Sequence, residues 1–427
     1  MDTLQKAFEG AIADMPRQVL AALLDRKLRE KKIRLKKPEL LKLAGDLIDN
    51  TSETFELNLP GAHAKKNVAI EITEEEQAKL VKDLNDFADN RIQKIVHDLT
   101  ESSAQNILST LRKRWPREAQ RQRGEIAGFR RRLSQRWGRA LDLLAMLLTM
   151  SREYGGDIND ALRQQNDHME PRLVEVLTRL HARACQITEE VICLLRGGFA
   201  DGAMARWRTL HEIAAVSLLL SQHGEMLAER YVAHEVVESR KAALQYQRYA
   251  SRLGTEGLTE TELNDIEVQY KAATAKYGEN FAHPQGWAAE ALGKKNPQIA
   301  ELHEAAGIEH LGPYYRLASH NVHANPKGIF KKLGLMEGTH VLLSGPSNAG
   351  LADPGHSAAI SLLQISTSLH RLVTNIDTIV ALNMMSQLIP QIGEEFAKAH
   401  AQLQNDEEEF QRTMSTWVRE ETSGVRS

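Results

Sequence analysis

The sequence predicts an all-α fold, a mainly helical bundle, to which a small β-hairpin near the N-terminus is the one expected exception. Apolar residues recur every three or four positions between residues 171 and 196, which places them on one face of a helix. Gly197 and Gly198 then interrupt this pattern, and a second, nearly wholly apolar stretch runs from Ala203 to Leu220. These two stretches predict an αα-hairpin at the centre of the core, and the seam of its first helix comprises Leu173, Leu177, Leu180, Ala184, Ile187, Val191 and Leu194.

Composition favours a soluble, intracellular chain. The 427 residues are 42% hydrophobic and carry a formal net charge of -3, so an affinity for nucleic acid would require a local basic patch. Cys185 and Cys193 lie eight positions apart on one expected helix, too far for a disulfide. The N-terminus lacks the apolar core of a signal peptide, and the apolar run at 141–150 is too short to span a membrane. We therefore expect a reducing, cytoplasmic setting and no membrane partner.

The N-terminal region is expected to be helical, apart from the hairpin. Amphipathic patterns cover residues 1–50, whereas residues 54–72 alternate with period two around Pro60-Gly61, which predicts two short strands. A capping box from Thr73 to Glu76 then opens a helix. Two domains are predicted, residues 1–155 and residues 156–427.

A basic segment covers residues 112–139. Eleven cationic side chains against Glu118 and Glu125 give it a local charge of +9, and Trp115, Phe129 and Trp137 lie among them. Basic surfaces with interleaved aromatics bind nucleic-acid backbones and stack bases. The alternative is a solvated helix face whose arginines pair with acidic segments such as residues 406–409. The predicted nucleic-acid contacts are Arg130, Arg131, Arg132 and Arg136.

The second helix of the central hairpin carries two charges one turn apart. Asp201 is a plausible N-cap for this helix. Arg208 and Glu212 follow in the middle of its apolar stretch, where an unpaired charge is costly, so they are predicted to form a buried charged pair.

Helical patterning continues through residues 225–250 and resumes near Leu263, before an irregular connection at 281–298. Pro313 can then open a helix that Asn325-Pro326 ends. On this helix Arg316, His320 and His323 are expected to share one face, at offsets of four and seven.

This arrangement has three interpretations. As catalytic residues, the histidines and the arginine would cleave RNA without a metal by acid–base chemistry and charge stabilisation. Arg316 and His323 would lie roughly 10 Å apart along the helix axis, which favours a site completed by a second subunit. As ligands the histidines lack a recognisable third partner, so no metal and no cofactor are predicted. As structural groups, they are satisfied histidines near a helix end.

The C-terminal part combines a loop and long helices. Residues 334–354 are rich in turn residues, with neither the lysine of a phosphate-binding loop nor the serine elbow of an esterase. A long helix is expected from Ser357 through Leu382, packing on the central hairpin, and a second from Gly393 ends in an acidic tail.

Three short motifs carry a resemblance to a known family. They are residues 194–203 (LLRGGFADGA), residues 208–212 (RTLHE), and residues 315–319 with 322–326 (VHANP). Over residues 170–385 the chain resembles the bacterial domain-of-unknown-function family fifty-six seventy-seven, which implies an all-α domain of unassigned biochemistry. It is more loosely similar to the HEPN nucleases, whose motif has four to six residues between an arginine and a histidine. Arg316 and His323 match that spacing, whereas Leu317 stands where that family usually has a polar residue.

Two functions of different classes are expected. The first is RNA cleavage or RNA binding in a defence or toxin role, with Arg316, His320 and His323 as catalytic residues. The second is a non-catalytic interaction or structural module, so whether the chain is an enzyme is left open. RNA and a second copy of the chain are the candidate partners.

Overall fold

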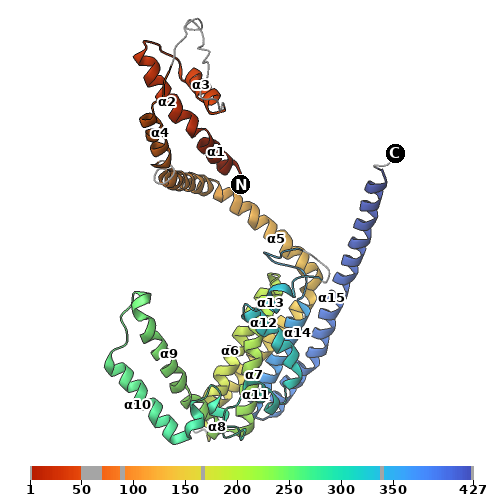
Figure 1. Ribbon diagram of the computed structural model, residues 1–427. Helices are drawn as coiled ribbons and strands as arrows, with labels where there is room; N and C mark the ends of the chain where they lie inside the picture. The colour runs from red at the N-terminus through yellow and green to blue at the C-terminus, as the bar shows by residue number, and fades with distance from the viewer. Residues whose placement is uncertain (1, 50–69, 87–91, 165–168, 337–340, 425–427) are drawn as a thin grey trace. The chain divides into compact units, whose positions relative to one another are not determined.

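The structure, a computed structural model, describes residues 2–49, 70–86, 92–164, 169–336 and 341–424. It divides the chain into two units, residues 1–122 and 123–427. The domain boundary expected after residue 155 lies inside one long helix, α5 (Ile92–Arg163), which contributes to both units (Figure 1). The described residues form helices and no strand, so the all-α fold class is confirmed. The expected hairpin lies almost entirely outside the described residues.

The first unit is a small helical assembly with a core of its own. Leu24 and Leu28 of α2 pack with Leu43 and Ala44 of α3, and all four side chains are buried. The predicted capping box is present, because Thr73 Oγ1 accepts a hydrogen bond from the backbone N–H of Glu76 and the Glu76 carboxylate accepts one from the backbone N–H of Thr73. The helices that precede α5 are α1 (Asp2–Ala13), α2 (Met15–Glu30), α3 (Lys37–Asp49) and α4 (Glu74–Asp86).

The second unit is built around the predicted αα-hairpin. Its two members, α6 (Pro171–Arg196) and α7 (Ala200–His223), pack along each other, and α7 also contacts α14 (Ala352–Ser368). Trp207 is fully buried and its Nε1 donates to the carbonyl of Ser357 and to Ser361 Oγ, which ties α7 to α14. The core of this unit therefore lies where the periodicity of residues 171–220 predicts it.

Further helices cover this core (Figure 1). A long helix, α15 (Ile376–Gly424), packs against α14, whereas α12 (Gly312–Val322) and α11 (Ile299–Ala305) pack against α7. The remaining elements of the second unit are α8 (Glu225–Ala233), α9 (Glu235–Tyr249), α10 (Glu260–Tyr277) and α13 (Pro326–Phe330), with short 3-10 turns between some of them.

The prediction of one long helix from Ser357 through Leu382 is wrong. Helix α14 ends at Ser368, and a 3-10 turn over Leu369–Arg371 leads to a new helix start. Asn375 Oδ1 accepts from the backbone N–H of Thr378 at 2.9 Å, a capping contact that opens α15. Gly393, the expected start of the next helix, lies within α15.

Over the described ranges, no helix combines the length and the apolar character that crossing a bilayer requires.

Candidate functional site

Arg208 and Glu212 form an ion pair on α7. The Nη2–Oε1 distance is 3.1 Å, and the two side chains are 26% and 35% exposed. The pair is thus half-buried, whereas the sequence predicts a buried one. The reason is its position on the helix, since both residues lie at the edge of α7 while Trp207 and His211 occupy the buried face.

Tyr315 of α12 joins this pair. Its hydroxyl donates to Glu212 Oε1 at 2.6 Å and accepts from Arg208 Nη2 at 2.9 Å, and the Arg208 guanidinium lies 4.9 Å from the centre of the tyrosine ring. Burial, together with the hydrogen bond to Glu212, raises the pKa of Tyr315 to about 12. The three side chains therefore form one charged network that fixes α12 on α7.

Two buried histidines lie behind this network. His211 of α7 and His303 of α11 have ring centres 4.5 Å apart, and His303 packs edge-on against Tyr315. Among the described residues neither ring nitrogen of His211 has a hydrogen-bond partner. Burial, reinforced by the neighbouring His303, lowers the pKa of His211 to about 3, so both rings pack as neutral groups. Sequence reasoning missed them, although the position of His211 on the buried face of α7 was a signal for its burial.

The three residues predicted as catalytic do not share one helix face. Helix α12 ends at Val322, and His323 has an extended backbone (φ -102°, ψ 137°). This differs from the expected helix through His323, because the chain has already left the helical conformation before Asn325-Pro326. Arg316 is exposed on α12. The histidines, in contrast, line one cleft.

This histidine cleft has a volume of about 340 Å³ and lies between the first turns of α7 and the region around the end of α12. His320, His323 and Lys332 supply its titratable nitrogen groups. Arg316 is not part of its lining. The cleft is lined by Asp201, Gly202, Ala205, His320, Asn321, Val322, His323, Ala324, Gly328, Ile329 and Lys332.

Hydrogen bonds hold both walls of the cleft. Asn325 Nδ2 donates to His320 Nδ1 at 2.7 Å, while Asn325 Oδ1 accepts from the backbone N–H of Gly328. Since the amide oxygen is already engaged, the amide nitrogen is the donor, and the neutral His320 ring carries its hydrogen on Nε2. A side chain at Gly328 would collide with the carbonyl oxygen of His320, so the close approach of α13 to α12 requires glycine there.

Asp201 has a different role from the expected N-cap. Helix α7 begins after Phe199, and the Asp201 carboxylate accepts from the backbone N–H groups of Leu333 at 3.0 Å and Gly334 at 3.4 Å. It thereby fastens the segment that follows α13 to the start of α7.

The four arginines predicted to contact nucleic acid have different surroundings. Arg136 is paired with Asp406 of α15, one of the acidic residues named in the alternative interpretation of the basic segment. Arg130, Arg131 and Arg132 are exposed, but at about 100° per residue they spread over more than half of the helix circumference. Of the aromatic residues, Trp137 is buried and donates to Asn348, whereas Trp115 is 57% exposed.

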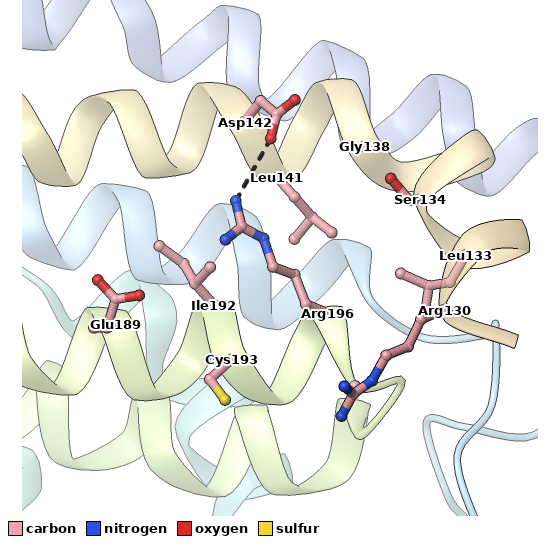
Figure 2. Close-up of a pocket in the computed structure, with 11 residues that line it drawn as sticks. Arg130, Leu133, Ser134, Gly138, Leu141, Asp142, Glu189, Ile192, Cys193 and Arg196 are labelled. Atoms are coloured by element: carbon pink, nitrogen blue, oxygen red, sulfur yellow. Dashed lines mark ion pairs between the residues drawn. The ribbon is translucent and has the colours of Figure 1, made fainter. Parts of the chain in front are cut away.

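A further hollow of about 410 Å³ lies between α5 and α6 (Figure 2). Arg196, at the end of α6, reaches across it to Asp142 of α5 at 3.5 Å, and Glu189 and Cys193 lie on the α6 side. The positive charges of Arg130 and Arg196 balance the negative charges of Asp142 and Glu189, so the net charge of this hollow favours neither anionic nor cationic ligands.

The fold and the cleft define a class of protein, an all-α domain with a histidine-lined cleft between two helix ends. Residues 174–340, which include that cleft, match the model of the Family of unknown function (DUF5677). The family predicted from the three motifs is thus confirmed over this stretch, and the looser similarity to HEPN nucleases stays a prediction. No curated protein and no solved structure matches the chain.

Proposed function

We propose that the histidine cleft cleaves RNA without a metal ion. The observation that carries the proposal is the composition of the cleft, in which two imidazoles and one ammonium group line a single hollow. This set supplies the proton acceptor, the hydrogen-bond donor and the cation that phosphodiester cleavage by the 2′-hydroxyl requires.

In this proposal each group has one role. His323 is exposed and takes the proton from the 2′-hydroxyl as general base. His320, oriented by Asn325, directs its Nε2–H at a non-bridging phosphoryl oxygen. Lys332 stabilises the added negative charge and gives a proton to the departing 5′-oxygen. The O2′–P bond forms as the P–O5′ bond breaks, leaving a 2′,3′-cyclic phosphate and a 5′-hydroxyl.

The setting of this activity belongs to the same proposal. Both cysteines are free, which suits a reducing cytoplasm, and RNA cleavage there suits a defence or toxin role. The exposed Arg130, Arg131 and Arg132 are available for non-specific contacts with the RNA backbone outside the cleft.

The test is cleavage of end-labelled RNA in the presence of a chelator, with mass analysis of the product ends. His320→Ala and His323→Ala are each expected to lower the rate about a hundredfold or more, since a positioned proton-transfer group contributes that much. His223→Ala is the matched control, because His223 is exposed at the opposite end of α7. Intact RNA after incubation with the wild-type protein would favour the non-catalytic interaction module.

Arg316→Ala separates two forms of the site. If the cleft acts within one chain, the rate should stay within a few-fold of wild type, because Arg316 is not part of the cleft lining. A loss as large as that of His323→Ala would point to the site predicted from the sequence, in which a second copy of the chain completes the arginine–histidine pair.

A further inference from the structure

The segment beside the histidine cleft combines an exposed aromatic ring with cations. Residues 326–332 read PKGIFKK, and we call them the Phe330 segment. The Phe330 side chain is 83% exposed, so it forgoes the free energy of burial although the unit has a large core. Lys327, Lys331 and Lys332 are also exposed. The segment therefore presents an apolar ring in a positively charged setting.

The backbone of this segment is held at both ends. At its start, Asn325 bonds both His320 and the backbone N–H of Gly328. Just after its end, Asp201 accepts from the backbone N–H of Leu333 at 3.0 Å. Phe330 thus lies on a backbone held between two anchors, which lowers the cost of ordering this segment when a ligand binds.

The Phe330 segment also separates two hollows. Gly328, Ile329 and Lys332 line the histidine cleft. Phe330, Lys331 and Lys332 line a larger hollow of about 1110 Å³, whose other wall belongs to α15. Lys332 lines both hollows, so the two hollows adjoin at this side chain.

We propose that the Phe330 segment binds single-stranded RNA, with a base next to the cleaved phosphodiester stacked on Phe330 and the neighbouring phosphates against Lys327 and Lys331. The proposal rests on the proposed function, because it names the form of RNA that enters the cleft. Aromatic rings with adjacent cations bind single strands in this way, since every base offers a face for stacking.

The opposite wall favours a single strand over a duplex. Glu407 and Glu408 of α15 also line the larger hollow, where Arg412 pairs with Glu408 at 3.1 Å and leaves Glu407 as the uncompensated carboxylate of the two. The second backbone of a duplex would meet the carboxylates of this hollow, Glu407 and Asp353 among them, and its bases are already stacked on one another. A single strand can keep its phosphates on the lysine side and turn one base onto Phe330.

The experiment measures binding of a single-stranded 2′-O-methyl RNA oligonucleotide, which has no free 2′-hydroxyl and stays intact. Phe330→Ala should weaken binding about tenfold, whereas Phe330→Trp should restore it and show quenched tryptophan fluorescence. Lys327→Gln together with Lys331→Gln should lower the slope of log affinity against log salt by up to about two. Phe410→Ala is the matched control, because Phe410 is 58% exposed but follows three glutamates.

Three results would overturn the proposal: no binding by the wild-type protein, equal binding by wild type and Phe330→Ala, or equal affinity for single strand and duplex. The first of these would leave Phe330 as a contact for a protein. Unchanged thermal midpoints will show that the variants are folded. The two proposals fail separately. If the wild-type protein cleaves RNA but Phe330→Ala binds as well as wild type, only the proposal for the Phe330 segment is overturned. If binding depends on Phe330 but ordinary RNA stays intact, only the catalytic proposal is overturned.

Discussion

Tyr315 links the charged pair on α7 to α12 through a single hydroxyl group. Tyr315→Phe keeps the ring packing against His303. It removes the hydroxyl group that donates to Glu212 and that accepts from Arg208. Because the pair is half-buried, we expect the free energy of unfolding to fall by about 1–2 kcal/mol, toward the lower end for bonds to charged groups. Urea denaturation measures this change.

Tyr314→Phe is the control for that measurement. Tyr314 precedes Tyr315 on α12 and is 40% exposed, so losing its hydroxyl should change stability by less than about 0.5 kcal/mol. Equal effects of the two substitutions would show that the network contributes no net stability.

At this scale the one specific pair that the sequence predicted lies between near neighbours. Arg208 and Glu212 are one turn apart, so helical periodicity alone brings them together. Tyr315 is 103 positions from Glu212, and no local pattern predicts that its hydroxyl meets the carboxylate. His320 and His323 were identified as candidates from their residue type, whereas Lys332 was missed because it follows α13, outside the helix that carries His320.

Among the elements, α5 offers a direct comparison of two adjacent glycines. A side chain at Gly155 would collide with the buried ring of His181 on α6, whereas one at Gly156 would meet open space. Gly155→Ala should therefore destabilise the protein by about 1–3 kcal/mol through overpacking. Gly156→Ala should stabilise it by up to about 1 kcal/mol, because alanine has the higher helix propensity.

Thermal unfolding of the two variants gives opposite shifts of the midpoint if α5 and α6 pack as described. The measurement is sensitive because both positions are helical, so propensity cancels and only the contact with His181 distinguishes them. Two upward shifts would mean that His181 can move aside and that the α5–α6 contact is loose.

The sequence predicted the helices themselves better than the positions at which they end. Periodicity predicted α6 and α7 because their apolar faces extend over many turns. It failed near Asn375 and at His323, where a side-chain cap or a change of backbone conformation interrupts an otherwise helical pattern. Such breaks depend on one or two residues, so apolar spacing does not reveal them.

For the whole molecule, buried neutral histidines make stability depend on pH. Burial lowers the pKa of His181 to about 4 and, together with neighbouring histidines, that of His211 to about 3. The unfolded chain has the ordinary value near 6.5 and binds protons below it, whereas the native state does not. Stability should therefore fall as the pH drops below about 6.5, by about 2 kcal/mol per histidine at pH 5.

His211→Phe tests this prediction. The ring nitrogens of His211 have no hydrogen-bond partner among the described residues, so phenylalanine keeps the stacking without the titration. The difference in unfolding free energy between pH 7 and pH 5 should shrink by about 2 kcal/mol. His223→Phe, at an exposed position, should leave it unchanged, and an undiminished difference in His211→Phe would mean that His211 does not bind a proton on unfolding.

The contact between Asp201 and Leu333 also sets when the cleft can exist during synthesis. Its two partners are 132 positions apart, so the cleft cannot form before Leu333 has been synthesised, long after the start of α7. A growing polypeptide that has not yet released residue 334 lacks one wall of the hollow, however well its central hairpin has formed. Helices α14 and α15, which complete the core around the central hairpin, are synthesised only after the last residue of the cleft.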